Sequence, residues 1–240
     1  MTSLRINLWS SPRNLSTALM YSFAQRVDTV VLDEPLYGHY LRHQPTKAKH
    51  PGRAEVLEAQ PDSGEEVIER LLYEDFGSPI LICKQMTHHL IDLSADFLLS
   101  MRNVILIREP RAILASYSRV VDRITAYDVG LSRQLWLYDF LRESGMPPVV
   151  VDATRLRNDP EEQLSSLCHR LGINFEPTMM QWPDGPKPYD GVWAKYWYAG
   201  VHQSKGFKPA GEQNLSLSSE LESIAKQYQE RYDALLKHAV

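Results

Sequence analysis

Five short apolar runs, rich in β-branched residues and separated by segments of helical character, constrain the fold of this chain more than any other feature. The runs occupy residues 5–9, 29–33, 79–84, 103–107 and 147–152. Strands that are apolar on both faces and alternate with helices are typical of a parallel sheet that is covered on both sides. The sequence therefore predicts an α/β fold, a doubly wound domain with a mainly parallel sheet of about five strands.

The segments between and after these runs carry helical periodicity or helix-capping residues. Helices are expected at residues 15–26, 64–75, 110–117, 131–143, 159–171 and 218–238. Two stretches are expected to form long irregular loops. Residues 35–62 are polar and contain several prolines, and residues 182–211 are rich in proline and glycine. Because no repeat and no linker divides the 240 residues, we expect a single domain spanning 1–240.

Composition and charge exclude several classes of protein. The chain is 43% hydrophobic and 23% charged, which is ordinary for a globular protein. Its net charge of −4 argues against a nucleic-acid coat or a polybasic membrane binder and, taken alone, against a polyanionic ligand. The two cysteines, Cys83 and Cys168, are too few for a disulfide framework or a four-cysteine zinc site.

The chain also lacks the sequence signals of export and membrane insertion. No run approaches the roughly 18 apolar residues of a membrane span, and the residues after Met1 lack the apolar region of a signal peptide. We therefore expect a soluble, cytoplasmic protein without a nucleic-acid or membrane partner. A homo-oligomer is compatible with the sequence but is not indicated by it.

Ligands of open parallel sheets bind beyond the carboxyl ends of the strands. After the first run, Ser10-Ser-Pro-Arg-Asn-Leu-Ser-Thr17 leads directly into a helix, whose free N–H groups suit phosphate or sulfate. Arg13 would add a positive charge, and Ser16 and Thr17 would add hydroxyl donors. The Walker A pattern is absent, and a plain polar N-cap explains the same residues. The loop alone therefore leaves both interpretations open.

A second polar group follows the fourth run. Arg108 lies directly after this run, at the end of the predicted strand, and Ser116 lies eight residues further, two turns into the next helix. A lone arginine at a strand end is often only an ion-pair partner. The two groups converge on one anion if the strand and the helix meet at the same crevice as the first loop.

In order along the chain, these segments resemble the PAPS-dependent sulfotransferases, where PAPS is 3′-phosphoadenosine 5′-phosphosulfate. Pro12-Arg-Asn-Leu-Ser-Thr17 is similar to the family's 5′-phosphosulfate loop, P-K-x-G-T-x. Arg108-x-Pro110 with Ser116 is similar to its 3′-phosphate motif. Ile82-Cys-Lys84 resembles its lysine-bearing strand, and Leu156-Arg-Asn-Asp-Pro160 resembles its L-x-x-D-P segment. On this resemblance, the chain is identified as a divergent, soluble member with a P-loop NTPase-like domain.

The resemblance implies PAPS as the sulfuryl donor, no metal, and a small-molecule acceptor with a hydroxyl or amine. Arg108 and Ser116 would bind the 3′-phosphate, and Lys84 would stabilise the leaving phosphate. Lys205-Gly206 is faintly similar to the family's C-terminal R-K-G motif. The implied cofactor-binding residues are Pro12, Arg13, Asn14, Leu15, Ser16, Thr17, Arg108, Ser116, Lys205 and Gly206.

Three positions depart from the family pattern. Leu15 replaces the loop glycine, Ala153 replaces the tyrosine that stacks on adenine, and Met86 replaces a histidine that serves many members as the base. The base must then come from another residue. Glu34, which follows the second run, is the first candidate, because several branches of the family use a glutamate in this region. An ordinary ion pair between Glu34 and Arg13 is its alternative interpretation.

The expected catalytic residues are Glu34, Lys84, Arg13, His88 and His89, with the two histidines as second candidates for the base. The acceptor pocket is expected from the two irregular stretches, the second of which contains Trp182, Tyr189, Trp193, Tyr196, Trp197 and Tyr198. His39-x-x-x-His43 suggests a metal site, but a third ligand at recognisable spacing is missing. The rival functions are a catalytically inactive nucleotide-binding protein and a P-loop-type phosphotransferase.

Overall fold

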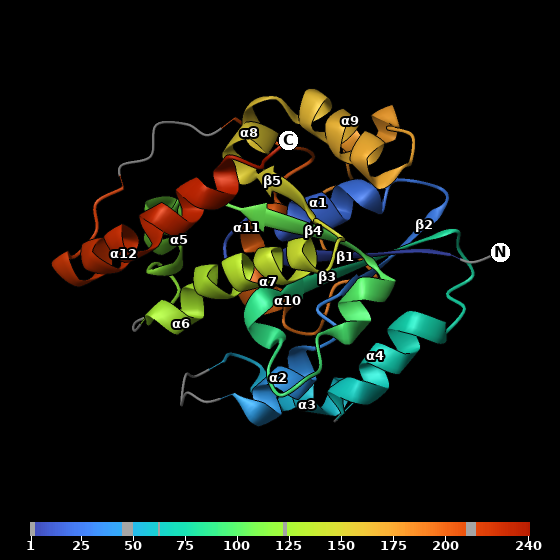
Figure 1. Ribbon diagram of the computed structural model, residues 1–240, viewed down its shortest axis with the longest axis horizontal. Helices are drawn as coiled ribbons and strands as arrows, with labels where there is room; N and C mark the ends of the chain where they lie inside the picture. Colours follow the sequence, from blue (N-terminus) through green and yellow to red (C-terminus); the bar gives the residue numbers. More distant parts are fainter. Residues whose placement is uncertain (1–2, 45–49, 62, 122–123, 210–214) are drawn as a thin grey trace.

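The computed structural model describes residues 3–44, 50–61, 63–121, 124–209 and 215–240. Its strands form one sheet of order β2-β3-β1-β4-β5, in which every neighbouring pair is parallel (Figure 1). The strands are β1 (Leu4–Ser10), β2 (Thr29–Asp33), β3 (Ile80–Met86), β4 (Arg102–Ile107) and β5 (Val149–Asp152). The predicted α/β fold with a five-stranded parallel sheet is confirmed.

Each expected helix is present, with small differences at its ends. The helices are α1 (Ser16–Phe23), α4 (Gly64–Tyr73), α5 (Pro110–Tyr117), α7 (Leu131–Glu143), α9 (Pro160–Leu171) and α12 (Ser219–Leu236). Short additional turns are η1 (Thr87–His89), η2 (Asp96–Ser100), α6 (Ala126–Val129), α8 (Ala153–Asn158) and η3 (Pro177–Met180). At both ends of α9, residues next to the helix determine where it begins and stops. The Asp159 side chain accepts a hydrogen bond from Glu162 N–H, and Gly172 closes the helix in the left-handed conformation.

Alternate residues of each strand face two different layers of helices. Ile6 and Leu8 pack with α1, α8 and α9, whereas Trp9 packs with α4, α7 and α12. Figure 1 shows α8 and α9 above the sheet and α4 below it. Because both faces are buried, successive positions within each strand carry apolar side chains, and this produced the apolar runs.

The two stretches predicted as irregular loops contain helices, which corrects that prediction. Residues 35–62 include α2 (Tyr37–His43) and α3 (Arg53–Ala59), and residues 182–211 include α10 (Ala194–Trp197) and α11 (Ala199–His202). Helices of four to seven residues are too short to display a clear period, and tertiary packing stabilises them. Tyr37, Tyr40, Leu41, Val56, Trp193, Ala194 and Tyr198 form one buried cluster that joins the two stretches. Residues 45–49, 62 and 210–211 of these stretches lie outside the described residues.

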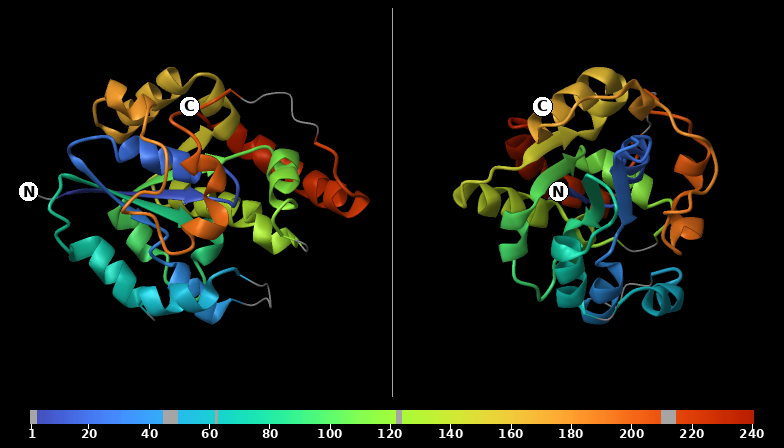
Figure 2. Two further views of the ribbon diagram at one scale, coloured as in Figure 1. Left: turned by 180° about the vertical axis from the view of Figure 1, so that it is seen from behind. Right: turned by 90° about the vertical axis from the view of Figure 1, so that its right-hand side faces the viewer.

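The second stretch lies close to the sheet. Both views in Figure 2 show the orange segment with α10 and α11 running past the sheet on the side that carries α1. Within the described residues, no helix has the length and apolar character that crossing a bilayer requires. Cys83 and Cys168 are both free and buried.

Candidate active site

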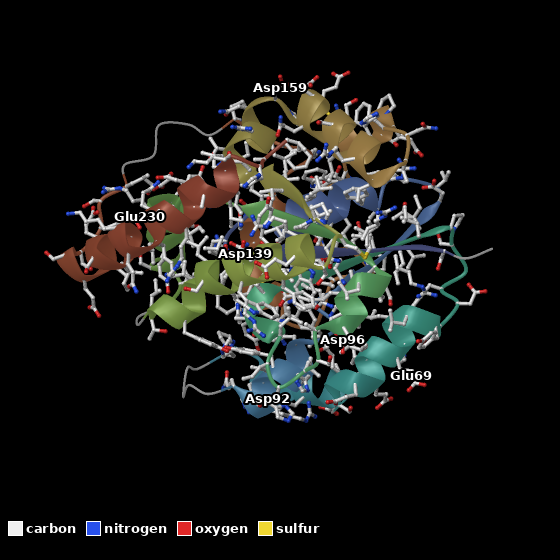
Figure 3. All side chains as sticks on the ribbon, viewed as in Figure 1. Glu69, Asp92, Asp96, Asp139, Asp159 and Glu230 are labelled. Atoms are coloured by element: carbon white, nitrogen blue, oxygen red, sulfur yellow. The ribbon has the colours of Figure 1, made fainter. Side chains whose placement is uncertain are left out.

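A cavity of about 400 Å³ lies where β1, β3 and β4 end. Among the described residues, its lining holds one acidic side chain, Glu34, and several cationic ones. The cationic residues are Arg13, Lys84, Arg108, Arg157 and Lys208. Acidic residues such as Glu69, Asp92, Asp96, Asp159 and Glu230, which are labelled in Figure 3, are exposed on the surface instead. The net charge of −4 therefore does not describe the cavity, which suits an anion.

The loop between β1 and α1 forms one wall of this cavity. Asn14 Nδ2 donates to the Leu106 carbonyl of β4 and, at 3.2 Å, to Ser11 Oγ, so the loop is tied to the adjacent strand. Leu15, at the position of the family glycine, adopts the left-handed conformation with φ of 60°. This conformation favours glycine. The side chain of Leu15 packs on the core, which offsets the backbone cost.

The loop, strand β4 and helix α5 meet through their polar side chains. Arg13 Nε donates to Ser116 Oγ at 3.1 Å, and an Arg108 guanidinium N–H donates to the Arg13 carbonyl at 2.5 Å. Within the described part of the chain, neither arginine forms an ion pair. Burial, with Arg157 and Arg13 nearby, lowers the pKa of Arg108 to about 10, so the guanidinium is charged at neutral pH. The loop that carries Arg13 and the segment that carries Arg108 and Ser116 therefore meet at one place. Joint binding of one anion requires this arrangement.

A buried cluster of charged groups lies deeper in the site. Lys84 Nζ donates to Asp33 Oδ1 at 2.9 Å, to Glu34 Oε1 and to the Tyr198 hydroxyl at 2.6 Å. The Tyr198 hydroxyl donates in turn to the Asp33 carboxylate at 2.8 Å. Glu34 therefore pairs with Lys84, and the alternative of an ion pair with Arg13 is wrong.

The surroundings of Glu34 change the pKa of its carboxyl group. Burial raises its pKa, Lys84 opposes the rise, and the neighbouring Asp33 carboxylate adds to it. Its second oxygen, Oε2, lies 3.9 Å from His89 Nε2. A raised pKa makes a carboxylate a better proton acceptor near neutral pH.

The two adjacent histidines, His88 and His89, also line the cavity. Burial lowers the pKa of His88 to about 3 and that of His89 well below the ordinary range. Both imidazoles are therefore neutral at pH 7. Neither Nδ1 atom has a hydrogen-bond partner among the residues described.

Every candidate cofactor-binding or catalytic residue except Lys205 lines this cavity. The Lys205 side chain is 72% exposed and lies 3.3 Å from Asp184 in an ion pair. Gly206 and Lys208 line the cavity in its place. Arg157 Nε donates to the Lys208 carbonyl at 2.7 Å and so fixes this segment.

The aromatic residues of the second stretch divide between two roles. Trp193, Trp197 and Tyr198 line the cavity, as does Tyr37 from the first stretch. Trp182 instead packs in the core against α1 and α9. Both stretches thus contribute aromatic surface to the cavity, although not every tryptophan does.

The metal interpretation of His39 and His43 is not supported by their hydrogen bonds. His39 Nδ1 accepts from Gly64 N–H at 3.1 Å, and its Nε2 lies 2.8 Å from the Ile91 carbonyl. Both ring nitrogens are therefore engaged by the backbone. In the described ranges there is no group of three or more metal-ligating side chains.

Two charged residues of the site, Asp33 and Arg157, had not been singled out in the sequence, and Tyr198 was expected as part of the aromatic acceptor pocket but not as a partner of Lys84. Arg157 lies within the L-x-x-D-P segment, and this position could have drawn attention to it. Asp33 and Lys84 are register partners on β2 and β3. Sequence alone does not give strand register, so it carried no signal for that pair.

The chain as a whole matches a known protein family over nearly its full length. The family model described as a sulfotransferase domain matches residues 4–229. The chain belongs to this sulfotransferase family.

Sulfotransferases of known structure share the fold at low sequence identity. An Alicyclobacillus acidocaldarius sulfotransferase aligns over 100% of this chain and 98% of its own, with a TM-score of 0.58 and 12% identity. The sulfotransferase domain of a Synechococcus olefin synthase aligns over 95% of this chain and 96% of its own, with a TM-score of 0.52 and 18% identity. A mouse sulfotransferase complexed with PAP aligns over 98% of this chain and 89% of its own, with a TM-score of 0.54 and 9% identity.

Two Arabidopsis thaliana proteins are similar in sequence to this sulfotransferase domain. They are named branched-chain-amino-acid aminotransferase-like proteins 1 and 2, and they are 42% and 39% identical over 203 residues, or 84% of this chain. The chain spans about a third of these curated relatives, since the match covers 36% of each.

Proposed function

We propose that this protein transfers the sulfuryl group of PAPS to a hydroxyl or amine of a small-molecule acceptor. The observation that carries the proposal is the contact of Arg13, Ser116 and Arg108 at the carboxyl ends of β1 and β4. It joins a helix N-terminus to two guanidinium groups that lack acidic partners among the described residues. The mouse sulfotransferase of the same fold, complexed with PAP, supports the choice of nucleotide.

The cavity accounts for both ends of the donor. The 5′-phosphosulfate would lie at the N-terminus of α1, where the N–H groups, Arg13, Ser16 and Thr17 supply donors. The 3′-phosphate would lie at Arg108 and Ser116. Phe207, also in the lining, would give the adenine an aromatic surface that Ala153 lacks.

The transfer itself requires one base and one cation. The acceptor oxygen or nitrogen forms a bond to sulfur while the bond from sulfur to the 5′-phosphate oxygen breaks, and the electron pair stays on that oxygen. Glu34 would receive the acceptor proton, and Lys84 would neutralise the negative charge on the leaving phosphate. In-line positioning supplies much of the remaining acceleration, by analogy with phosphoryl transfer.

The acceptor would enter along the aromatic side of the cavity. Tyr37, Trp193 and Trp197 line this side, which favours an alcohol or phenol with an apolar body. The cytoplasm is the expected location, since both cysteines are free thiols. The aminotransferase-like name of the plant relatives is not carried over, because the match covers only about a third of their length.

A catalytically inactive descendant that binds nucleotide is the second candidate, favoured by Met86 at the position of the usual base. Binding and turnover separate the two. PAP and PAPS are expected to bind much more tightly than AMP and ATP, because only the former present a 3′-phosphate to Arg108. Titration calorimetry with the four nucleotides measures this difference.

Equal affinity for all four nucleotides, or none, would contradict the sulfotransferase proposal. Tight PAP binding without PAP release from PAPS, across a panel of alcohols, phenols and amines, would instead support the inactive descendant.

A further inference from the structure

Lys84 is held by one more carboxylate than the proposed chemistry uses. Its ammonium donates to Asp33, Glu34 and Tyr198, and the side chain is fully buried. Glu34 has a role as the base. Asp33, which is 8% exposed, has none in the transfer described above.

The position of Asp33 ties the lysine to both the sheet and the segment over the cavity. Asp33 and Lys84 are partners in the β2–β3 register. The Asp33 carboxylate also accepts from the Tyr198 hydroxyl at 2.8 Å and from Gly191 N–H at 3.0 Å. All of these partners donate to Asp33, which is the pattern of an ionised carboxylate.

The charge of Lys84 depends on its acidic neighbours. Burial alone lowers the pKa of Lys84, but the Asp33 and Glu34 carboxylates reverse this effect and raise the pKa above its ordinary value. The other groups near it are Tyr198, Tyr37 and His89. Burial raises the pKa of both tyrosines and lowers that of His89, so these three groups are neutral at pH 7.

Proton transfer to Glu34 would remove one of the two negative charges beside Lys84. At that moment the leaving phosphate needs the ammonium most, and a buried lysine without a counter-charge tends to lose its proton. The Asp33 carboxylate is in place to prevent this, because it contacts the ammonium but does not line the cavity that the acceptor would enter.

We propose that Asp33 is a positioning residue that keeps Lys84 protonated and fixed while Glu34 takes the acceptor proton, an inference that rests on the proposed function. Asp33 acts through Lys84 and touches neither donor nor acceptor. Its charge, rather than its hydrogen bonds to the 182–211 segment, is the property that transfer requires.

The test compares Asp33→Asn with Asp190→Asn. Asp190 accepts from Tyr21 OH at 2.6 Å and from Lys187 N–H at 2.8 Å, and it contacts His202 Nε2 at 2.9 Å. It therefore holds the same segment without touching Lys84. In Asp33→Asn the alkaline limb of kcat/KM for PAP release is expected to move down by about 1–3 pH units, whereas in Asp190→Asn it stays in place.

Lysine side-chain NMR provides a readout that does not depend on turnover. The Nζ resonance of Lys84, assigned with Lys84→Arg, is expected to titrate at lower pH in Asp33→Asn than in the native protein. In Glu34→Gln, where Asp33 is the remaining counter-charge, Lys84 is expected to stay protonated at pH 7. This last measurement tests whether Asp33 keeps Lys84 protonated even if Asp33→Asn fails to fold.

An unchanged alkaline limb and Nζ titration in Asp33→Asn, or the same shift in Asp190→Asn, would overturn the inference. So would a neutral Lys84 in Glu34→Gln at pH 7. If the native protein neither binds PAP nor releases it from PAPS, the proposed function fails, and the Nζ titrations still report separately on Asp33.

Discussion

Arg108→Ala is expected to reduce the affinity for PAP by at least about 100-fold, to the level of AMP. Hydrogen bonds to charged groups contribute about 1.5–3 kcal/mol each, and every 1.4 kcal/mol corresponds to about tenfold in affinity. A guanidinium that makes two such bonds to the 3′-phosphate accounts for the expected loss. Titration calorimetry with PAP and AMP on the native protein and the variant measures it.

The AMP titration separates a lost phosphate contact from a deformed loop. Arg108 also donates to the Arg13 carbonyl, so its removal could disturb the loop that would hold the 5′-phosphate. If only the 3′-phosphate contact is lost, AMP affinity is unchanged. An equal loss for AMP and PAP would show that Arg108 supports the loop, and an unchanged PAP affinity would refute its binding role.

Arg5→Ala is the matched control for this variant. Arg5 also donates to a backbone carbonyl, that of Leu71, at 2.5 Å, but it lies on β1 near the amino end of the sheet. Its loss is expected to leave PAP and AMP affinities unchanged.

Glu34→Gln is expected to lower the rate of PAP release by about 100-fold or more while PAP binding is retained. Glutamine keeps the shape of the side chain and one oxygen for Lys84, but it does not take up the acceptor proton. Steady-state assays of PAP release and PAP titrations on the same preparations measure both quantities. If turnover survives, the base is His88, His89 or the acceptor itself.

The pH dependence tests the same role for Glu34. A base acts in its deprotonated form, so activity falls as the pH drops through its pKa. Because burial raises the pKa of Glu34, the acid limb of kcat/KM is expected above the ordinary glutamate value of about 4.3. In Glu34→Gln this limb is expected to disappear from the residual rate.

Glu222→Gln is the control for Glu34→Gln. Glu222 lies 2.6 Å from Arg111 in an ion pair outside the cavity lining. The same change from acid to amide there is expected to leave both the rate and the acid limb unchanged. A loss equal to that of Glu34→Gln would assign the effect to general destabilisation rather than to the base.

The fold could be predicted because its signals are local. Each strand carries its own apolar run and each long helix its own period or cap, as in the Asp159 and Gly172 caps of α9. The short helices α2, α3, α10 and α11 could not, because packing around Tyr37, Trp193 and Tyr198 stabilises them rather than their own periodicity. The single-domain organisation stays a prediction.

The sequence by itself determined the α/β class, the loop before α1 and the residues at the strand ends. These features depend on chemistry that each segment carries alone. Only the tertiary structure decided that Glu34 pairs with Lys84 and not with Arg13, that Asp33 faces Lys84, and that Lys205 points away. The reason is that register and loop packing bring together residues 50 to 165 positions apart, and in a single sequence no short-range pattern encodes such distances.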